Sequence, residues 1–240
     1  MANNKKNKKK PAPKPSTQTM SPKQYFLAGR PRALEIHECL INADWQIKGL
    51  ATILIARKHK TGNITFASFI VDIFCLGLKD ANSAFNRFEE DYNEYRDAIF
   101  GNNMNDEVLI TYDLAHNIIF GAIEYAKNLG FLPHKDWEFS QFMLEPKSSP
   151  SVEKIAVEFG QNGKPFFISG PYDKVDSVIS KLEKAVGEGN FTFTSGMPNS
   201  GFNFLNSPFS KYDDEDDEEE DDNDDNDENE TEDTDFEEVK

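Results

Sequence analysis

The strongest hydrophobic pattern in the chain is a pair of apolar runs separated by a short polar loop. LATILIARK (50–58) and ITFASFIVDIFCLGL (64–78) flank HKTGN, which contains a glycine suited to a tight turn. Both runs are rich in β-branched and aromatic residues, and apolar side chains occupy both faces of each. We therefore expect a β-hairpin whose two strands are central in a sheet and covered by helices on at least one side.

A short helix and a further strand are predicted before this hairpin. SPKQYFLAG has the pattern of a helix over 22–28, with Ser21 as the N-cap, Gln24 completing a capping box and Gly29 ending the helix. ALEIHECLI (33–41) has the composition of a strand.

Two longer helices are predicted after the hairpin. Beyond Ser83, apolar residues recur at helical spacing with acidic residues mostly on the other side. They are Phe85, Phe88, Tyr92, Tyr95 and Ile99. Apolar residues ring most of 112–129, so this second helix should pack deeply, and Gly130 can adopt the left-handed conformation that ends it. Asp136 is expected to cap a short third helix.

The last ordered segment predicts a β-hairpin, a helix and a strand. KIAVEFG (154–160) and KPFFISG (164–170) flank Asn162-Gly163, a pair that accepts the positive φ angles of a tight turn. A helix with apolar residues from Val175 to Val186 follows, and FTFT closes the unit as a strand. The predicted class is α+β: a central, mostly antiparallel sheet with packed helices, plus this C-terminal unit, with a possible subdomain joint at 147–151.

Charge is concentrated at the two ends of the chain. Residues 213–240 hold 20 Asp or Glu side chains among 28 positions, in a chain whose formal net charge is −17. Such a segment has too little apolar surface to offset its ordering entropy. We therefore expect residues 1–20 to be a disordered Lys- and Pro-rich arm, residues 21–195 to be one globular domain, and residues 196–240 to be a linker and a disordered acidic tail.

Cysteine usage and hydropathy favour a cytoplasmic protein. Cys39 and Cys75 lie in apolar runs without CxxC spacing, and no export signal is present, so we expect reduced thiols and no disulfide. The longest apolar stretch, 64–78, is shorter than the ~20 residues that a bilayer requires and contains Asp72. No membrane span is expected.

Asp72 is the first candidate for a special role, because a carboxylate within an apolar run is costly unless it is partnered or neutralised. We favour a structural partner such as a loop N–H, an Asn or a His. The alternative is a catalytic or metal-binding role, since perturbed carboxylates cluster at functional sites. Lys79 and Asp80 follow the break at Gly77; they are expected to cap the next helix, and the alternative places them at the same mouth as Asp72.

Other candidate residues lie further along the chain. His116 shares a helical face with apolar residues, which is more typical of a buried, hydrogen-bonded imidazole than of a ligand. Glu124 lies about 80° round the same helix. His134 and Asp136 offer a nitrogen and an oxygen to a divalent ion, although the helix-cap role of Asp136 is the preferred interpretation. The catalytic candidates are thus Asp72, Glu124 and His116, and the metal candidates are Asp72, Asp80, His134 and Asp136.

Three segments together resemble a family of bacterial proteins that has no assigned activity: VDIFCLGLKDA, HNIIFGAIEYAKNLGFLPHKDW and GQNGKPFFISGP. The resemblance covers about residues 34–194. It implies no catalytic residue and no cofactor. Some relatives carry this domain beside helical repeats, which favours a role in protein interaction.

Two classes of function follow from these observations. The first is a non-enzymatic binding or adaptor module without a cofactor, whose acidic tail modulates contact with basic or nucleic-acid-associated partners. The second is a nuclease-like hydrolase in which Asp72, Glu124 and nearby His or Asp residues hold divalent metal ions. The second requires at least three of these groups together around an open pocket. It also requires basic groups along a substrate path. We expect few along such a path outside Arg30, Arg32, Lys48, Arg57, Lys58 and Lys60.

Overall fold

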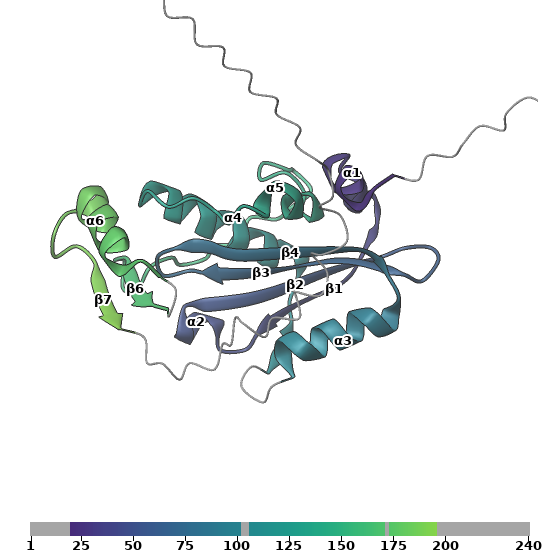
Figure 1. Cartoon of the computed structure of the whole chain (residues 1–240), viewed down its shortest axis with the longest axis horizontal. Coiled ribbons are helices and arrows are strands. Elements are labelled where there is room, and N and C mark those ends of the chain that lie inside the picture. Colours follow the sequence, from purple (N-terminus) through teal and green to yellow (C-terminus); the bar gives the residue numbers. More distant parts are fainter. Residues whose placement is uncertain (1–19, 102–105, 171–172, 196–240) are drawn as a thin grey trace, which may run out of the picture.

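A computed structural model describes residues 20–101, 106–170 and 173–195, and its centre is a five-stranded antiparallel sheet (Figure 1). The spatial order of the strands is β4-β3-β2-β1-β5. Their bounds are β1 (Glu35–Asn42), β2 (Leu50–Lys58), β3 (Ile64–Asp72), β4 (Gly77–Arg87) and β5 (Glu107–Leu109). The predicted α+β class with a mostly antiparallel central sheet is therefore confirmed.

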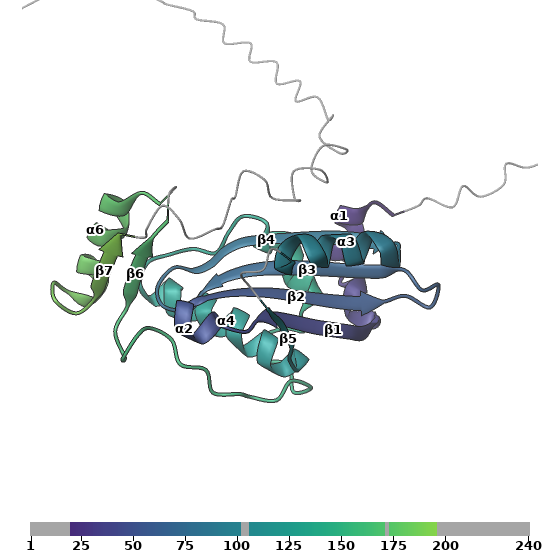
Figure 2. The same ribbon diagram turned by 90° about the horizontal axis from the view of Figure 1, so that it is seen from below.

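Helices cover both faces of this sheet. The longest helix, α4 (Tyr112–Asn128), lies on one face with α1 (Pro22–Leu27) and α5 (Trp137–Ser140), and α3 (Glu89–Phe100) lies on the other (Figures 1 and 2). The remaining elements are α2 (Trp45–Lys48), α6 (Val175–Val186) and two 3-10 helices, η1 (Arg30–Ala33) and η2 (Gln141–Met143). Separate apolar cores form on the α4 side and on the α3 side of the sheet.

The predicted hairpin is formed by β2 and β3. The two strands pair without a break from Leu50 opposite Asp72 to Lys58 opposite Ile64. Every residue of β3 and seven of the nine in β2 are buried, because helices cover both faces. The pattern of apolar residues on both faces thus predicted the central position of these strands correctly.

The predicted strand over 64–78 is wrong in one respect, because the structure divides it into two strands. β3 ends at Asp72, residues 73–76 turn back, and β4 begins at Gly77 with a φ of 71°. This turn is made of apolar residues because later parts of the chain pack over it: the N–H of Gly160 donates to the Ile73 carbonyl (2.9 Å), and the N–H of Phe166 donates to the Phe74 carbonyl (3.1 Å).

β4 continues to Arg87, so the expected helix after Ser83 begins only at Glu89. Lys79 and Asp80 do not cap that helix; they lie within β4. The pairing places Ile70 opposite Asp80 and Val71 opposite Leu78, which makes Lys79 an extra residue on the β4 side. Such a bulge redirects neighbouring side chains.

The two helix predictions that rested on capping signals are confirmed. α1 begins with Ser21, whose hydroxyl accepts from the Gln24 N–H while the Gln24 side chain accepts from the Ser21 N–H. α4 spans Tyr112–Asn128, and Gly130 has a φ of 86° just after it. Asp136 precedes α5 as expected, but its side chain makes no capping hydrogen bond.

The C-terminal unit differs from the predicted β-hairpin, helix and strand. Residues 154–160 form no strand, and a single bridge between Gln161 and Lys164 closes the turn in which Asn162 and Gly163 have positive φ. The strands that do form, β6 (Phe166–Ser169) and β7 (Thr192–Ser195), are parallel and connected through α6. Parallel pairing follows from the helical crossover, which returns the chain in the same direction.

Several other expectations can be compared with the described residues. Cys39 and Cys75 are both buried and free, as predicted. None of the helices within 20–101, 106–170 and 173–195 combines the length and apolar character that crossing a bilayer requires. The predicted basic arm, apart from Met20, and the predicted linker and acidic tail at 196–240 lie outside the described residues.

Candidate functional site

Asp72 lies at the end of β3, where its carboxylate is bonded to the backbone of the turn that follows. Oδ1 accepts from the N–H groups of Phe74 (2.8 Å) and Cys75 (2.9 Å), and Oδ2 accepts from the N–H of Leu76 (3.1 Å). Burial raises the pKa of Asp72, while the three N–H donors and the charge of Lys79 oppose that shift. The prediction of a structural partner such as a loop N–H is confirmed, and the turn supplies three such donors.

His116 lies on the buried face of α4 and also has a structural partner. Its side chain is buried, and Nε2 lies 2.9 Å from the carbonyl oxygen of Glu145. Because a carbonyl can only accept, Nε2 carries the proton of the neutral ring. Burial lowers the pKa of His116 below its ordinary value, and the nearby carbonyls oppose that shift. The prediction of a buried, hydrogen-bonded imidazole is confirmed.

His116 should make the stability of the protein sensitive to mild acid. Its folded pKa lies below the ordinary value of 6.5, so the unfolded chain binds the proton first as the pH falls, and stability is lost through that range. We expect the free energy of unfolding of a His116→Gln variant to depend less steeply on pH than that of the parent between about pH 7 and pH 5. Urea unfolding at several pH values measures these slopes.

His37 provides the matched control, since it is exposed on β1. A His37→Gln variant should keep the slope of the parent protein. Parallel curves for the parent and His116→Gln would show that His116 does not carry the effect.

Glu124 lies on the outer surface of α4, away from the apolar core. It is exposed, and its Oε2 lies 2.6 Å from Nζ of Lys147. The hydrogen bond and charge of Lys147 lower the pKa of Glu124. Asp72, His116 and Glu124 are therefore each bonded to a different neighbour and form no common site with one another.

Three of the four metal candidates do come together. Asp80 of β4, His134 and Asp136 each offer a ligand atom, and these atoms all lie within 4.8 Å of one another. His134 Nδ1 is 3.6 Å from Asp80 Oδ1 and 3.5 Å from Asp136 Oδ2. The three side chains are partly buried, with exposed fractions of 16%, 29% and 45% for Asp80, His134 and Asp136. We refer to these residues as the β4 triad.

The backbone explains why this triad forms. The N–H of His134 donates to the carbonyl of Leu78 (3.1 Å), which fixes the segment after α4 against the edge strand β4. The Ser140 N–H and hydroxyl both donate to the carbonyl of Asp136, at 3.0 and 2.9 Å, and so hold the start of α5. The sequence showed the local pair His134 and Asp136, but it carried no signal for the approach of Asp80 across 54 positions of the chain.

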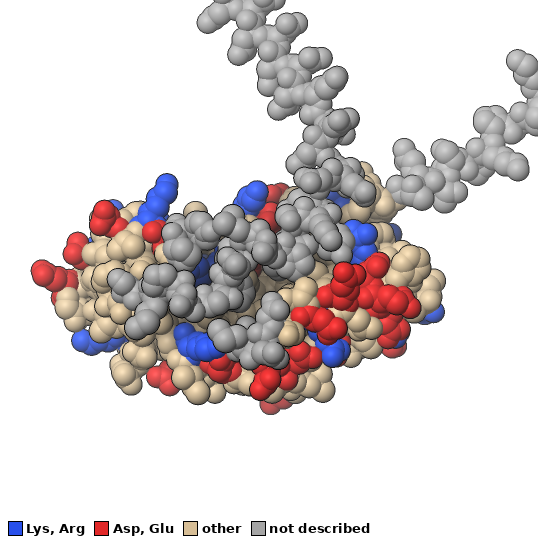
Figure 3. Space-filling model, turned by 60° about the horizontal axis from the view of Figure 1, so that its bottom comes forward, with Lys and Arg blue, Asp and Glu red and all other residues tan. Residues whose placement is uncertain are grey.

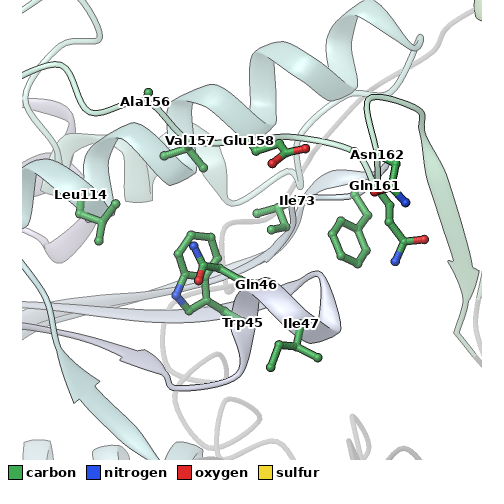
Figure 4. Close-up of a pocket in the computed structure, with 12 residues that line it drawn as sticks. Trp45, Gln46, Ile47, Ile73, Leu114, Ala156, Val157, Glu158, Gln161 and Asn162 are labelled. Atoms are coloured by element: carbon green, nitrogen blue, oxygen red, sulfur yellow. The ribbon is translucent and has the colours of Figure 1, made fainter.

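A hollow of about 430 Å³ lies elsewhere, between α2 and residues 156–162 (Figure 4). Trp45 and Ile47 of α2 face Val157 across it, and Gln161 and Asn162 lie near one end. Glu158 is the single charged residue of its lining. None of the candidate residues named from the sequence lines this hollow, which was not predicted.

Acidic side chains gather over α3 on the face shown in Figure 3. We call this surface the α3 acidic face; its residues are Glu89, Glu90, Asp91, Glu94 and Asp97. Four of the five are exposed, and Asp91 is half-buried. The exposed side chain of Phe88 lies at the start of the helix. Leu109 on β5 is also exposed, and an ion pair from Arg96 to Glu107 (3.0 Å) connects α3 to β5.

Comparisons of the chain with family models, with curated proteins and with solved structures find no match.

Proposed function

We propose that the protein is a cytoplasmic, non-enzymatic binding or adaptor module that contacts basic protein partners, of the kind associated with nucleic acids, through its acidic surfaces. The observation that supports this proposal is the α3 acidic face, with the exposed apolar side chain of Phe88 at its start. Charged side chains around apolar anchors are the usual composition of a protein interface. Complementary charge raises the rate of encounter and selects the partner.

The C-terminal segment extends the same chemistry. Residues 213–240 carry 20 acidic side chains, so a basic partner held near α3 would meet a second, larger source of negative charge on the same chain. Two weak contacts on one chain strengthen each other, because binding at the first raises the effective concentration of the second. In this proposal the segment modulates the affinity of the partner for the α3 acidic face.

Neutralising the α3 acidic face is expected to weaken the binding of a lysine-rich peptide with apolar residues. Exposed charge pairs contribute about 0.3 kcal/mol each, so five neutralisations should reduce the affinity about tenfold at low salt. The variant replaces each acid by its amide: Glu89→Gln, Glu90→Gln, Asp91→Asn, Glu94→Gln and Asp97→Asn. Fluorescence anisotropy of a labelled peptide measures the affinity, with and without residues 213–240.

The control removes the same number of charges from other exposed positions: Glu138→Gln, Glu153→Gln, Glu158→Gln, Glu183→Gln and Glu188→Gln. It should keep most of the affinity. Equal losses for both variants would mean that the net charge of the chain, and no particular surface, attracts the peptide, and the proposal would then fail. Added salt should weaken all tail-dependent binding, because exposed charges are screened beyond ~8 Å at physiological ionic strength.

The second candidate function is a metal-dependent hydrolase, and the β4 triad is the observation that favours it. Asp72 and Glu124, which the sequence offers as ligands, are instead bonded to the turn after β3 and to Lys147. A hydrolase would therefore have to use Asp80, His134 and Asp136. A bound metal ion is its first requirement.

A further inference from the structure

The β4 triad combines one imidazole nitrogen with two carboxylates from separate parts of the chain. Asp80 comes from an edge strand, and His134 and Asp136 come from the segment that connects α4 to α5. The same nitrogen, Nδ1 of His134, faces both carboxylates. Nitrogen and oxygen donors in this combination suit zinc and its neighbours in the first transition series better than they suit calcium or magnesium.

The donor atoms of the β4 triad lie close enough together to bind one ion. A hydrogen bond between imidazole and carboxylate would place the two atoms about 2.7–3.2 Å apart. The imidazole–carboxylate distances, 3.6 and 3.5 Å, are longer than that, and Nδ1 accepts a long hydrogen bond from the backbone N–H of Asp136 at 3.5 Å, which makes it the unprotonated nitrogen of the neutral ring. Two ligands bound at about 2.0 Å to one tetrahedral zinc ion lie roughly 3.3 Å apart, and two adjacent ligands of an octahedral magnesium ion lie roughly 3.0 Å apart. Adjacent ligands of a calcium ion at about 2.4 Å lie roughly 3.4 Å apart, so the spacing admits more than one ion, and it is the imidazole nitrogen that favours zinc over calcium.

We propose that Asp80, His134 and Asp136 form a binding site for a tetrahedral divalent transition-metal ion of the zinc type, with a water molecule in the fourth position. His134 binds through Nδ1, and each Asp binds through one carboxylate oxygen. This site is independent of the proposed binding of basic partners, since it lies at β4 and α5 and uses none of the acids of α3.

The surroundings of the triad hold the three ligands in place. Asp80 Oδ1 accepts from the N–H of Ala81 (2.8 Å), a second contact of the kind that orients a metal-binding carboxylate. Lys79, the bulged residue next to Asp80, pairs with Asp173 at 3.1 Å, so its ammonium group is bonded outside the triad. A metal ion here would connect β4 to the start of α5 and strengthen the contact that the His134 N–H makes with Leu78.

Cobalt(II) is the probe that tests this site in the full chain. Tetrahedral Co²⁺ absorbs visible light much more strongly than octahedral Co²⁺, and carboxylates that form no preorganised site leave the ion with most of its water shell in octahedral form. Titration of the full-length protein is expected to give an intense visible spectrum that saturates at one ion per chain and is abolished by zinc. The His134→Ala variant should lose that spectrum and bind zinc at least about tenfold more weakly in competition.

Asp136→Asn is the second variant, because the side chain of Asp136 makes no capping bond and its loss should leave α5 folded. It should also reduce the tetrahedral spectrum. His37→Ala, on the exposed part of β1, is the matched control and should leave the spectrum unchanged. Weak octahedral absorption in the parent protein, or a tetrahedral spectrum that persists in both His134→Ala and Asp136→Asn, would overturn the proposal.

Discussion

An Arg57→Ala variant is expected to unfold with a free energy about 3–5 kcal/mol lower than the parent protein. Arg57 is 3% exposed, and its guanidinium group lies between β2, the N-terminal 3-10 helix and the segment after α5. Its Nε donates to the Met143 carbonyl (3.1 Å), its Nη1 donates to the Leu34 carbonyl (2.8 Å), and its face lies 5.4 Å from the ring centre of Tyr112. Truncation to alanine leaves the carbonyls of Met143 and Leu34 without this donor. It also removes the packing of the aliphatic part of the Arg57 side chain.

Urea or thermal unfolding measures this loss, which corresponds to a fall in melting temperature of roughly 10 °C for a domain of this size. Lys58→Ala is the control at the next position, where the side chain makes a surface ion pair with Glu89 at 3.4 Å; it should cost less than about 1 kcal/mol. Arg57→Lys should recover only part of the loss, because an ammonium group cannot reproduce the planar, forked arrangement of N–H donors of the guanidinium group. A cost for Arg57→Ala as small as that for Lys58→Ala would contradict this role.

Arg57 also illustrates a limit of reading charge from sequence. A base at the end of an apolar strand has the pattern of a surface residue, and the sequence therefore suggests that Arg57 could contact a substrate. The hydrogen-bond acceptors of Arg57 include backbone carbonyls of η1 and η2. The carbonyl of Arg32 is 25 positions away in the chain, and that of Met143 is 86 positions away. No local pattern shows that such acceptors will be present.

The elements that the sequence predicted best are those whose signals are local. The β2–β3 hairpin has two apolar runs and a glycine in the loop, and α4 has apolar residues round its circumference with Gly130 after its end. These features act within a few residues of one another. Position in the sheet was also predictable, because apolar residues on both faces require two covering layers.

The errors occurred where distant segments decide the local structure. The turn after Asp72 contains apolar residues, which normally indicate a continuing strand, because residues 160 and 166 cover it. The strand over 77–87 has in part the pattern of a helix, since Phe85 continues the spacing of the helical apolar residues. Residues 154–160 alternate like a strand but find no neighbouring strand to pair with in the part of the chain described.

The candidate site was predictable only in part for the same reason. His134 and Asp136 are two positions apart and could be paired from the sequence. Asp80 joins them because a bulge at Lys79 and the bond from His134 to Leu78 bring β4 alongside. Asp72 is the first candidate in the sequence because a carboxylate is costly to bury, and its three bonds to the N–H groups of the turn explain that burial structurally.

An Asp72→Ala variant is expected to lose about 4 kcal/mol of stability, because it leaves the N–H groups of Phe74, Cys75 and Leu76 without their acceptor. These donors lie in the turn between β3 and β4, where the first two bonds are buried and water cannot replace the carboxylate. Chemical unfolding measures the total loss. Hydrogen exchange of the amides of residues 74–76 should accelerate first, since local opening of the turn no longer breaks any bond to Asp72.

The comparison with two further variants separates the hydrogen bonds from the charge. Asp72→Asn keeps one oxygen in the position of Oδ1 and removes the negative charge, so it should retain the bonds to Phe74 and Cys75 and lose mainly the bond to Leu76. We expect its cost to fall between those of the parent and Asp72→Ala. Asp97→Ala, an exposed position on α3, should change stability by less than about 0.5 kcal/mol. If Asp72→Ala were as harmless as Asp97→Ala, the carboxylate would not be what holds the buried turn, and the division of 64–78 into two strands would need another cause.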